Sequence, residues 1–467
     1  MNYMMLLSVI GFIALMMIVG VIVSKKINDA DDFFLGGRNV PAFLIVATLL
    51  ASEVGGGVML GSVGLAYQFG FGACWYVMPV AVGLVLFGLF LAKKLKRDAD
   101  QHGYVSMFDW LAGRYDNYKP LKAIGGFVML VGFIGALASQ FVAMGTALQS
   151  VMGADKTMAI VLGGIAIVVY ASMGGLLSVM WTDLLQAGVF IFGMVVLLPM
   201  LLAQPEVGGF AGLFANAPEH FFDVMNVQTP TWRITTLVTM TIAPFVRQYY
   251  YQRMFASKSE KIAQRSVFAQ AILIVIVTIW TCLVGMCVFM INPALENPES
   301  AMPWVLSAVM HPVVAAIVMG AICATVMSTA DTFLNAGSLT FVMDILKNVK
   351  KDEMTQEQSL KVARNSSFAV GAIALVIAVM SSSVVSALMN AWAILGGGLF
   401  VPMVVSYFYK PSTKEGVMAA MVAGLVTTLL FTIVIKGFAV PAIVCGLIAA
   451  FIALVAVSAI TKNKANA

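Results

Sequence analysis

The sequence predicts an all-α integral membrane protein with 13 transmembrane helices. Lipid must be its solvent, because 61% of the 467 residues are hydrophobic and only 10% are charged, whereas soluble domains carry about 25% charged residues. Apolar runs of membrane-spanning length follow one another along the chain, separated by polar loops. Lysine and arginine are concentrated in every second loop, which is the charge pattern of a protein that crosses the membrane many times.

Each expected span is an apolar run long enough to cross the hydrocarbon core, which takes about 20 residues. The first run has no lysine or arginine before it and no small-residue cleavage site after it, so we expect a retained span rather than a signal peptide. The segment 104–117 places Met107, Trp110 and Leu111 on one face and is expected to form a short interfacial helix. The spans are expected near 4–24, 40–67, 71–92, 121–150, 157–175, 177–203, 233–253, 266–291, 308–344, 364–382, 384–409, 415–435 and 438–461.

The positive charges predict the orientation of a multi-pass protein in the cell membrane. With the N-terminus outside and the C-terminus in the cytoplasm, all but four of the 27 lysines and arginines, Arg253 included, fall on inner loops. Three exceptions, Lys156, Arg233 and Lys436, fall on outer loops, and the fourth, Arg247, lies within a span.

This topology predicts two repeats of opposite orientation, because the second span begins inside and the seventh begins outside. Inverted repeats are typical of secondary transporters, whose sites lie at the midplane where helices are broken. The single domain, 1–467, is expected to comprise one extra first helix (4–24), a first five-helix repeat (40–203), an inverted second repeat (233–409) and two extra C-terminal helices (415–461).

Helix breaks are expected at matching places in the two repeats. Gly55-Gly56-Gly57 lies in the middle of the second span and Pro244 in the middle of the seventh. Glycine weakens a helix and proline removes a backbone donor, so carbonyl groups freed at each break can coordinate a cation. The alternative is that these residues serve helix packing, which membrane helices tolerate.

Four ionisable side chains lie deep in spans, where they are costly and usually functional: Glu53, Asp183, Arg247 and Asp331. Glu53 and Arg247 lie at the breaks of the two repeats. They could neutralise each other as an ion pair, or Arg247 could bind a substrate carboxylate while Glu53 faces a cation. The two interpretations are compatible, because a zwitterion could insert between them.

The ninth span carries a stripe of hydroxyl groups from Thr325, Ser328, Thr329 and Thr332, which spans roughly 100° of the helix surface. With Asp331 close by, these groups offer hard oxygen ligands to a small cation. Alternatively, the hydroxyls bond back to carbonyls of their own helix. Asp183 likewise shares a polar face with Gln186, and either contributes to ion binding or is stabilised by neighbouring hydroxyls.

Other function classes are disfavoured. No phosphate-binding Gly-x-x-x-x-Gly-Lys-Ser/Thr loop occurs, and no nucleophile–base pair or metal cluster suggests an enzyme. The five cysteines are scattered in apolar runs and are expected to be packed thiols. We expect a small-molecule substrate and membrane lipid as partners, and no nucleic acid. A cation channel or a sensor on the same fold remains an alternative, although only Lys462–Ala467 follow the last span.

Three motifs stand in order along the chain: Asp32-Phe33-Phe34-Leu35-Gly36-Gly37-Arg38, Gly174-Gly175-Leu176 with Thr182-Asp183 and Gln186, and Met327-Ser328-Thr329 with Asp331. They resemble motifs of the sodium:solute symporter family, and their order matches from about residue 5 to 460. The resemblance implies a leucine-transporter-type 5+5 inverted repeat with sodium as the coupling ion. It also implies a sodium site built from the carbonyls of Ala51, Val54 and Thr325 and the hydroxyls of Ser328 and Thr329. For members with a second sodium it implies a site at Asp183, Asp331 and Thr332, where Asp331 replaces the serine of several members, so the number of coupled ions stays open.

The substrate is expected to carry a carboxylate, as an amino acid or a small organic acid does. Trp75 and the run from Gln248 to Arg253 resemble the choline-transporter branch, but Arg247 stands where that branch has a cage aromatic and would repel choline. Symport of a choline- or betaine-like quaternary amine remains the alternative. Trp392 and Gly396-Gly397-Gly398 are candidate gating elements. The expected substrate site is lined by Glu53, Gly55, Gly56, Trp75, Gln140, Arg247 and Gln248.

Overall fold

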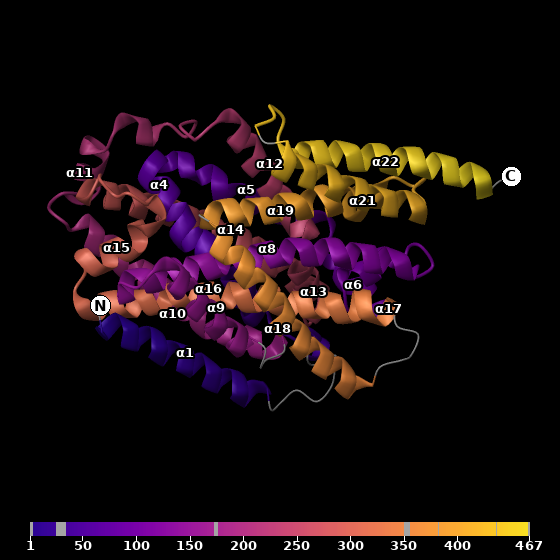
Figure 1. The fold of residues 1–467 in the computed structure, drawn as a ribbon, viewed down its shortest axis with the longest axis horizontal. Coiled ribbons are helices and arrows are strands. Elements are labelled where there is room, and N and C mark those ends of the chain that lie inside the picture. Colours follow the sequence, from indigo (N-terminus) through magenta and orange to yellow (C-terminus); the bar gives the residue numbers. More distant parts are fainter. Residues whose placement is uncertain are drawn as a thin grey trace.

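The computed structural model describes residues 3–24, 34–171, 176–349, 355–381, 383–435 and 437–465, and these residues are almost entirely helical (Figure 1). Within these ranges no β-strand occurs, and the only bridge pairs Val40 with Ser257. The Gly174-Gly175 part of the second family-like motif, and residues 32 and 33 of the first, lie outside the described residues.

Each of the expected spans falls on a helix or a broken helix. Nine helical segments among the described residues are long and apolar enough to cross a membrane, and Ala42–Glu53, Lys156–Val169 and Arg364–Met380 are shorter apolar helices. A multi-pass membrane architecture is therefore established, while the count of thirteen crossings stays a prediction. The helices that form most of these segments are α1 (Tyr3–Ser24), α5 (Cys74–Phe90), α8 (Lys119–Met152), α9 (Lys156–Ala171), α10 (Leu176–Leu202), α14 (Glu260–Ile291), α16 (Pro312–Leu339), α18 (Gln356–Met380), α19 (Val384–Phe400), α21 (Lys414–Leu429) and α22 (Ala442–Ala465).

Shorter helices and turns connect or extend these spans. They are η1 (Gly36–Arg38), α3 (Ala42–Glu53), η2 (Gly57–Ser62), α4 (Val63–Phe69), η3 (Gly70–Ala73), α6 (Ala92–His102), α7 (Met107–Ala112), α11 (Gly209–Asn216), η4 (Glu219–Phe222), α12 (Pro230–Val246), α13 (Gln248–Ala256), η5 (Pro298–Ser300), α15 (Ala301–Ala308), η6 (Thr340–Leu346), α17 (Lys347–Val349), η7 (Val401–Val405), α20 (Ser406–Phe408) and η8 (Leu430–Val434).

The second span is broken between α3 and η2, where the three glycines lie. Val54 leaves the helical region, with φ −88° and ψ 71°. An added Cβ would lie 2.4 Å from Thr329 Oγ1 at Gly55 and 2.1 Å from the Ala143 Cβ at Gly56. Glycine is thus required here because α16 and α8 approach the backbone of the break directly.

The seventh span is broken between α12 and α13, three residues after Pro244. Arg247 is the single residue between the two helices and is extended, with φ −104° and ψ 118°. The break places the Arg247 side chain against the end of α3, where it contacts Glu53. The expected break therefore exists, at Arg247 rather than at the proline itself.

The two breaks lie at the centre of the molecule, between peripheral helices. In Figure 1, α1 runs along one side, where it packs on α10 and α16, and the paired α21 and α22 lie on the opposite side. Between them, α3 packs on α10, α14 and α16, and α13 packs on α16 and α6. A site at the breaks is therefore enclosed by protein on all sides.

The short helix α7 is the segment that was expected at the membrane interface. A capping box between Ser106 and Asp109 begins it. Met107, Trp110 and Leu111 do share a face, but all three are buried in the protein. The apolar face of this segment is therefore covered by neighbouring helices and not by lipid.

Candidate functional site

A buried ion pair joins the two helix breaks. Arg247 Nη1 donates to both carboxylate oxygens of Glu53, at 2.7 and 2.8 Å. The side chains are only 1% and 7% exposed, so each charge depends on the other for its stability. Of the two interpretations from sequence, the mutual ion pair is the arrangement that the structure contains.

Two tyrosines from α13 complete the surroundings of Glu53. The hydroxyls of Tyr249 and Tyr250 donate to Glu53 Oε2 at 2.9 and 3.0 Å. Gln270 of α14 donates to the Tyr250 hydroxyl at 3.1 Å and to the Leu49 carbonyl at 2.9 Å. Glu53 is therefore fixed from two sides, by charge and by neutral hydroxyl donors.

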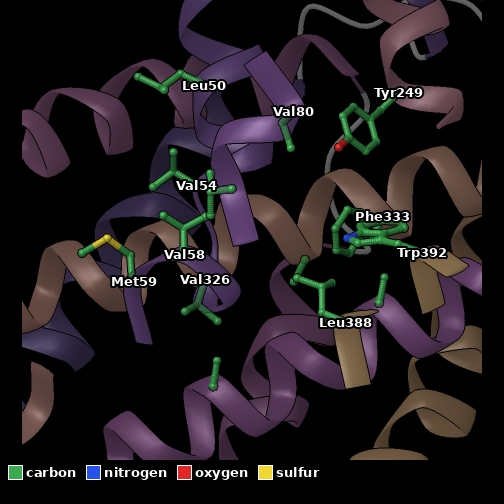
Figure 2. Packing of buried hydrophobic residues seen from close by; sticks show 14 of the residues in the cluster. Leu50, Val54, Val58, Met59, Val80, Tyr249, Val326, Phe333, Leu388 and Trp392 are labelled. Carbon is green, nitrogen blue, oxygen red and sulfur yellow. The ribbon is translucent and has the colours of Figure 1, made fainter. Parts of the chain in front are cut away.

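An aromatic wall covers the other side of Arg247. Its guanidinium carbon lies 3.9 Å from the centre of the Trp392 ring, a cation–π contact. Phe333 of α16 packs edge-on against Trp392, with ring centroids 5.4 Å apart. Figure 2 shows Phe333 and Trp392 together, with Leu388 from the same helix as Trp392 beside them. Trp392, expected as a gating residue, thus directly contacts the charged pair.

The cavity between these groups is small. Its volume of about 20 Å³ is room for about one water molecule. Its lining includes Glu53, Gly55, Gln140, Arg247 and Trp392. A solute can be accommodated only if the ion pair opens or the aromatic wall moves.

Gln140 of α8 binds the backbone of the glycine break. Its Oε1 accepts a hydrogen bond from the Gly56 backbone N–H at 2.9 Å, and its Nε2 donates to Ser139 Oγ at 3.0 Å. The amide therefore satisfies a donor that the broken helix leaves free.

Two residues expected in the substrate site lie elsewhere. Trp75 is at the start of α5, where its Nε1 donates to the Val224 carbonyl at 2.9 Å. Gln248 follows Arg247 directly, but its Oε1 accepts from the Met107 N–H at 2.8 Å and so ties α13 to α7. Neither residue lines the central cavity. Gly56 lies beside the cavity without lining it, and its N–H is bound by Gln140.

The oxygens expected around the first sodium lie on facing segments, at the end of α3 and in α16. Thr329 Oγ1 lies 3.1 Å from the Ala51 carbonyl oxygen and 3.0 Å from that of Thr325. A hydroxyl has one hydrogen, so it satisfies only one of these two carbonyls at a time. The surplus of oxygen lone pairs at this point is what a cation could use.

Ser328 is oriented by the buried carboxylate of α10. Its Oγ donates to Asp183 Oδ1, and Thr48 Oγ1 donates to Asp183 Oδ2 at 2.5 Å. Because the serine hydrogen is used in this bond, its lone pairs remain as the coordinating part of the hydroxyl. Asp183 is completely buried.

Two of the three residues expected around a second sodium, Asp183 and Thr332, lie beside a guanidinium group instead. Arg253 Nη2 lies 3.1 Å from Thr48 Oγ1, 3.1 Å from Ser52 Oγ and 3.0 Å from Thr332 Oγ1. It also lies 4.0 Å from Asp183 Oδ2, and both side chains are fully buried. Asp331 is buried on α16 beside Thr332.

Sequence reasoning missed several of these residues. Arg253 was assigned to an inner loop by the charge rule, and Tyr249, Tyr250, Thr48 and Ser52 were not considered as site residues. The sequence did contain one indication that two of them lie together. Tyr249 and Arg253 are four residues apart on α13 and therefore share a face of that helix.

The chain matches proteins of one family over most of its length. The model of the sodium:solute symporter family matches residues 33–424. The high-affinity proline transporter PutP of Bacillus subtilis is 25% identical over 425 residues, 89% of each chain. The sodium/proline symporter of Haemophilus influenzae is 26% identical over 88% of this chain and 85% of its own. The human high affinity choline transporter 1 is 24% identical over 90% of this chain and 75% of its own.

A solved structure has the same fold. A sodium-coupled sialic acid symporter, in a substrate-bound outward-open state, matches with a TM-score of 0.80 and 22% identity over 98% of both chains. The arrangement of helices described above is therefore the fold of that solved structure.

Proposed function

The chain belongs to the sodium:solute symporter family, and from this premise we propose that its sodium-coupled symport carries a small solute with a carboxylate, such as an amino acid or a small organic acid. Symport with sodium of a small organic solute is the activity of the family and its relatives. The class of solute is inferred from the Glu53–Arg247 pair.

A zwitterion fits this pair better than a neutral solute does. Opening a buried ion pair leaves two uncompensated charges, which costs several kcal/mol. A solute carboxylate would replace Glu53 on Arg247, and a solute ammonium would replace Arg247 on Glu53. The opened site would then contain two ion pairs in place of one. The similarity to proline transporters supports the same class of solute.

A quaternary amine fits the observed arrangement poorly. Such a cation needs an aromatic face, and the Arg247 guanidinium already covers that of Trp392. The like charge of Arg247 would also repel it. Choline-like transport therefore requires Arg247 to move away from the site and is our second candidate, supported by the choline transporter among the relatives.

We propose that the coupling sodium binds where α3 ends against α16. The carbonyls of Ala51, Val54 and Thr325 and the hydroxyls of Ser328 and Thr329 would coordinate it. Thr329 would exchange its hydrogen bonds to the two carbonyls for shared coordination of the cation. Sodium binding would thus join α3, whose end carries Glu53, to α16, which couples the ion site to the solute site.

We further propose that one sodium accompanies each solute. The guanidinium of Arg253 lies among the hydroxyls of Thr48, Ser52 and Thr332 and 4.0 Å from Asp183 Oδ2. Asp183 and Thr332 are two of the three residues expected around a second sodium. Two unit charges 4 Å apart repel by about 4 kcal/mol at an effective dielectric constant of 20. A sodium ion at Asp183, Asp331 and Thr332 would have to overcome that repulsion or displace Arg253.

We propose that the protein crosses the membrane with thirteen helices and that its N-terminus lies outside. The repeats 40–203 and 233–409 would alternate access around the two central breaks. The broken helices α3–η2 and α12–α13 support this proposal, because each contributes one member of the Glu53–Arg247 pair.

Uptake into sealed proteoliposomes tests the proposed solute class. Labelled amino acids, organic acids and choline are presented with and without an inward sodium gradient, for the wild type, Arg247→Gln and the surface control Arg97→Gln. We expect sodium-dependent uptake of a carboxylate solute that Arg247→Gln abolishes and Arg97→Gln preserves. Sodium-dependent choline uptake would refute the assigned role of Arg247, and a free sodium leak without solute accumulation would indicate a channel.

A further inference from the structure

Within the described part of the chain, two cations, Lys94 and Arg114, contact aromatic rings and not carboxylates. Lys94 Nζ lies 4.2 Å from the centre of the Tyr407 ring. The Arg114 guanidinium carbon lies 4.9 Å from the same ring and 4.7 Å from that of Trp110. Trp110 and Tyr407 stack with centroids 5.5 Å apart. We call Lys94, Trp110, Arg114 and Tyr407 the aromatic–cation cluster.

Neither cation of this cluster has an acidic partner among the described residues. Neighbouring charges do pair: Lys96 with Asp100, Arg97 with Glu260 and Lys122 with Asp109. The carboxylate of Asp98, which faces the cluster, accepts a hydrogen bond from Trp110 Nε1 at 2.9 Å. Among the described residues, the cluster therefore carries two positive charges without a salt bridge.

Arg114 in particular has unused hydrogen-bonding capacity. Its Nε and Nη2 are buried and have no hydrogen-bond partner in the structure. Burial lowers the pKa of Arg114 from its ordinary value, because a charged group loses hydration without gaining a counter-ion. A buried donor left unpaired is costly, so an anion that reached this group would be stabilised.

The cluster adjoins an apolar surface that faces outward. Leu89 and Phe90, at the end of α5, are 59% and 61% exposed, and Phe408, next to Tyr407, is 63% exposed. In a membrane protein such side chains face lipid tails. Phe90 is the last residue of α5 and Lys94 lies in the first turn of α6, so the cations lie where the apolar surface ends.

We propose that the aromatic–cation cluster binds the phosphate headgroup of an anionic phospholipid, whose acyl chains lie on Leu89, Phe90 and Phe408. Charge complementarity selects an anion, and the exposed apolar side chains select one that is attached to hydrocarbon. A second cation–aromatic contact, Lys414 Nζ at 4.7 Å from the Tyr118 ring, extends the positive surface on the same side. The bound lipid would connect α6 and α7 to α20, elements far apart in the chain.

Native mass spectrometry of the purified full-length protein measures this binding with phosphatidylglycerol and phosphatidylcholine as probes. Two variants remove the site in different ways: Lys94→Gln/Arg114→Gln removes the charges, and Tyr407→Leu removes the ring beneath them without changing charge. The control Lys93→Gln/Arg97→Gln removes the same number of charges from the exposed side of α6. Sodium-dependent solute uptake, or thermal unfolding, checks that each variant is folded.

We expect the wild type to retain phosphatidylglycerol in preference to phosphatidylcholine. At about 1 kcal/mol for each cation near a lipid surface, each charge removed from the cluster should weaken retention about 5-fold, and Tyr407→Leu should also weaken it. The control pair should leave the specific adduct unchanged. Equal loss in the control, no effect of Tyr407→Leu, or competition by inorganic phosphate as strong as that by the lipid would each overturn the proposal.

Discussion

Arg253 Nη2 and Asp183 Oδ2 lie 4.0 Å apart at the centre of the bundle, and both side chains are fully buried. Thr48 Oγ1 bridges them, since it donates to Asp183 at 2.5 Å and accepts from Arg253 at 3.1 Å. The pair joins α10 to α13, the helix that follows the Arg247 break. A cation built into the chain thus lies beside the carboxylate that ion binding would otherwise use.

This arrangement predicts a coupling ratio of one sodium per solute. Parallel uptake of labelled sodium and labelled solute into proteoliposomes measures the ratio directly. We expect one labelled sodium ion for each labelled solute in the wild type and in Arg253→Lys, which preserves the charge. The Hill coefficient for the sodium dependence of uptake should be near one in both. In Arg253→Gln the vacated oxygens become available, and the coefficient should rise if transport persists. Two sodium ions per solute in the wild type would show that Arg253 does not exclude a second ion.

The same pair predicts a non-additive effect on stability. Asp183→Asn leaves the Arg253 guanidinium buried without its counter-charge, which should destabilise the fold by about 3–5 kcal/mol. The double variant Asp183→Asn/Arg253→Gln removes both charges and should recover part of that loss. Thermal unfolding of the purified protein, analysed as a double-mutant cycle, measures the coupling.

Glu260→Gln is the matched control for this cycle. It breaks the pair with Arg97, in which the two side chains are 35% and 56% exposed. The loss should therefore stay below about 1 kcal/mol. Additive losses for Asp183→Asn and Arg253→Gln would mean that the two buried charges do not depend on each other.

The hydroxyl of Thr329 should matter for sodium affinity, and that of Thr325 should not. Thr329 Oγ1 lies between two carbonyls of the proposed sodium site, whereas Thr325 Oγ1 donates to the Ile322 carbonyl of its own helix. We expect Thr329→Ala to raise the sodium concentration for half-maximal uptake about 5- to 10-fold, in line with about 1–1.5 kcal/mol for one hydroxyl. Thr325→Val should leave it nearly unchanged, because its carbonyl remains. Equal effects of the two variants would argue against this site.

The sequence predicted features that depend on local rules. Helix-length apolar runs, the break at the three glycines and the break near Pro244 all follow from backbone chemistry that acts over a few residues. The position of the second break was less accurate, because Pro244 stays within α12 and the chain leaves the helix only at Arg247.

Features that depend on contacts between distant segments could not be read from the sequence. Counting positive charges placed Arg253 in an inner loop, whereas its side chain is enclosed by residues of α3, α10 and α16. Trp75 was placed in the substrate site by resemblance, but its indole binds the Val224 carbonyl instead. In both cases the outcome depends on which helices pack together, and single-helix periodicity carries no information about that.

Glu53 should select for an ammonium group on the solute, separately from the role of Arg247 in selecting a carboxylate. In Glu53→Gln the amide still accepts hydrogen bonds from Tyr249 and Tyr250 but no longer carries a negative charge. An ion pair with a buried carboxylate is charge-assisted and about twice as strong as a neutral hydrogen bond. We therefore expect Glu53→Gln to raise the KM for a transported amino acid about 10-fold or more, which corresponds to about 1.4 kcal/mol. Competition by the matching carboxylic acid, which has no amino group, should be preserved or improved. Competition assays in proteoliposomes with both compounds measure this change in selectivity. If both compounds lose affinity equally, Glu53 serves only to position Arg247, and the solute ammonium binds elsewhere.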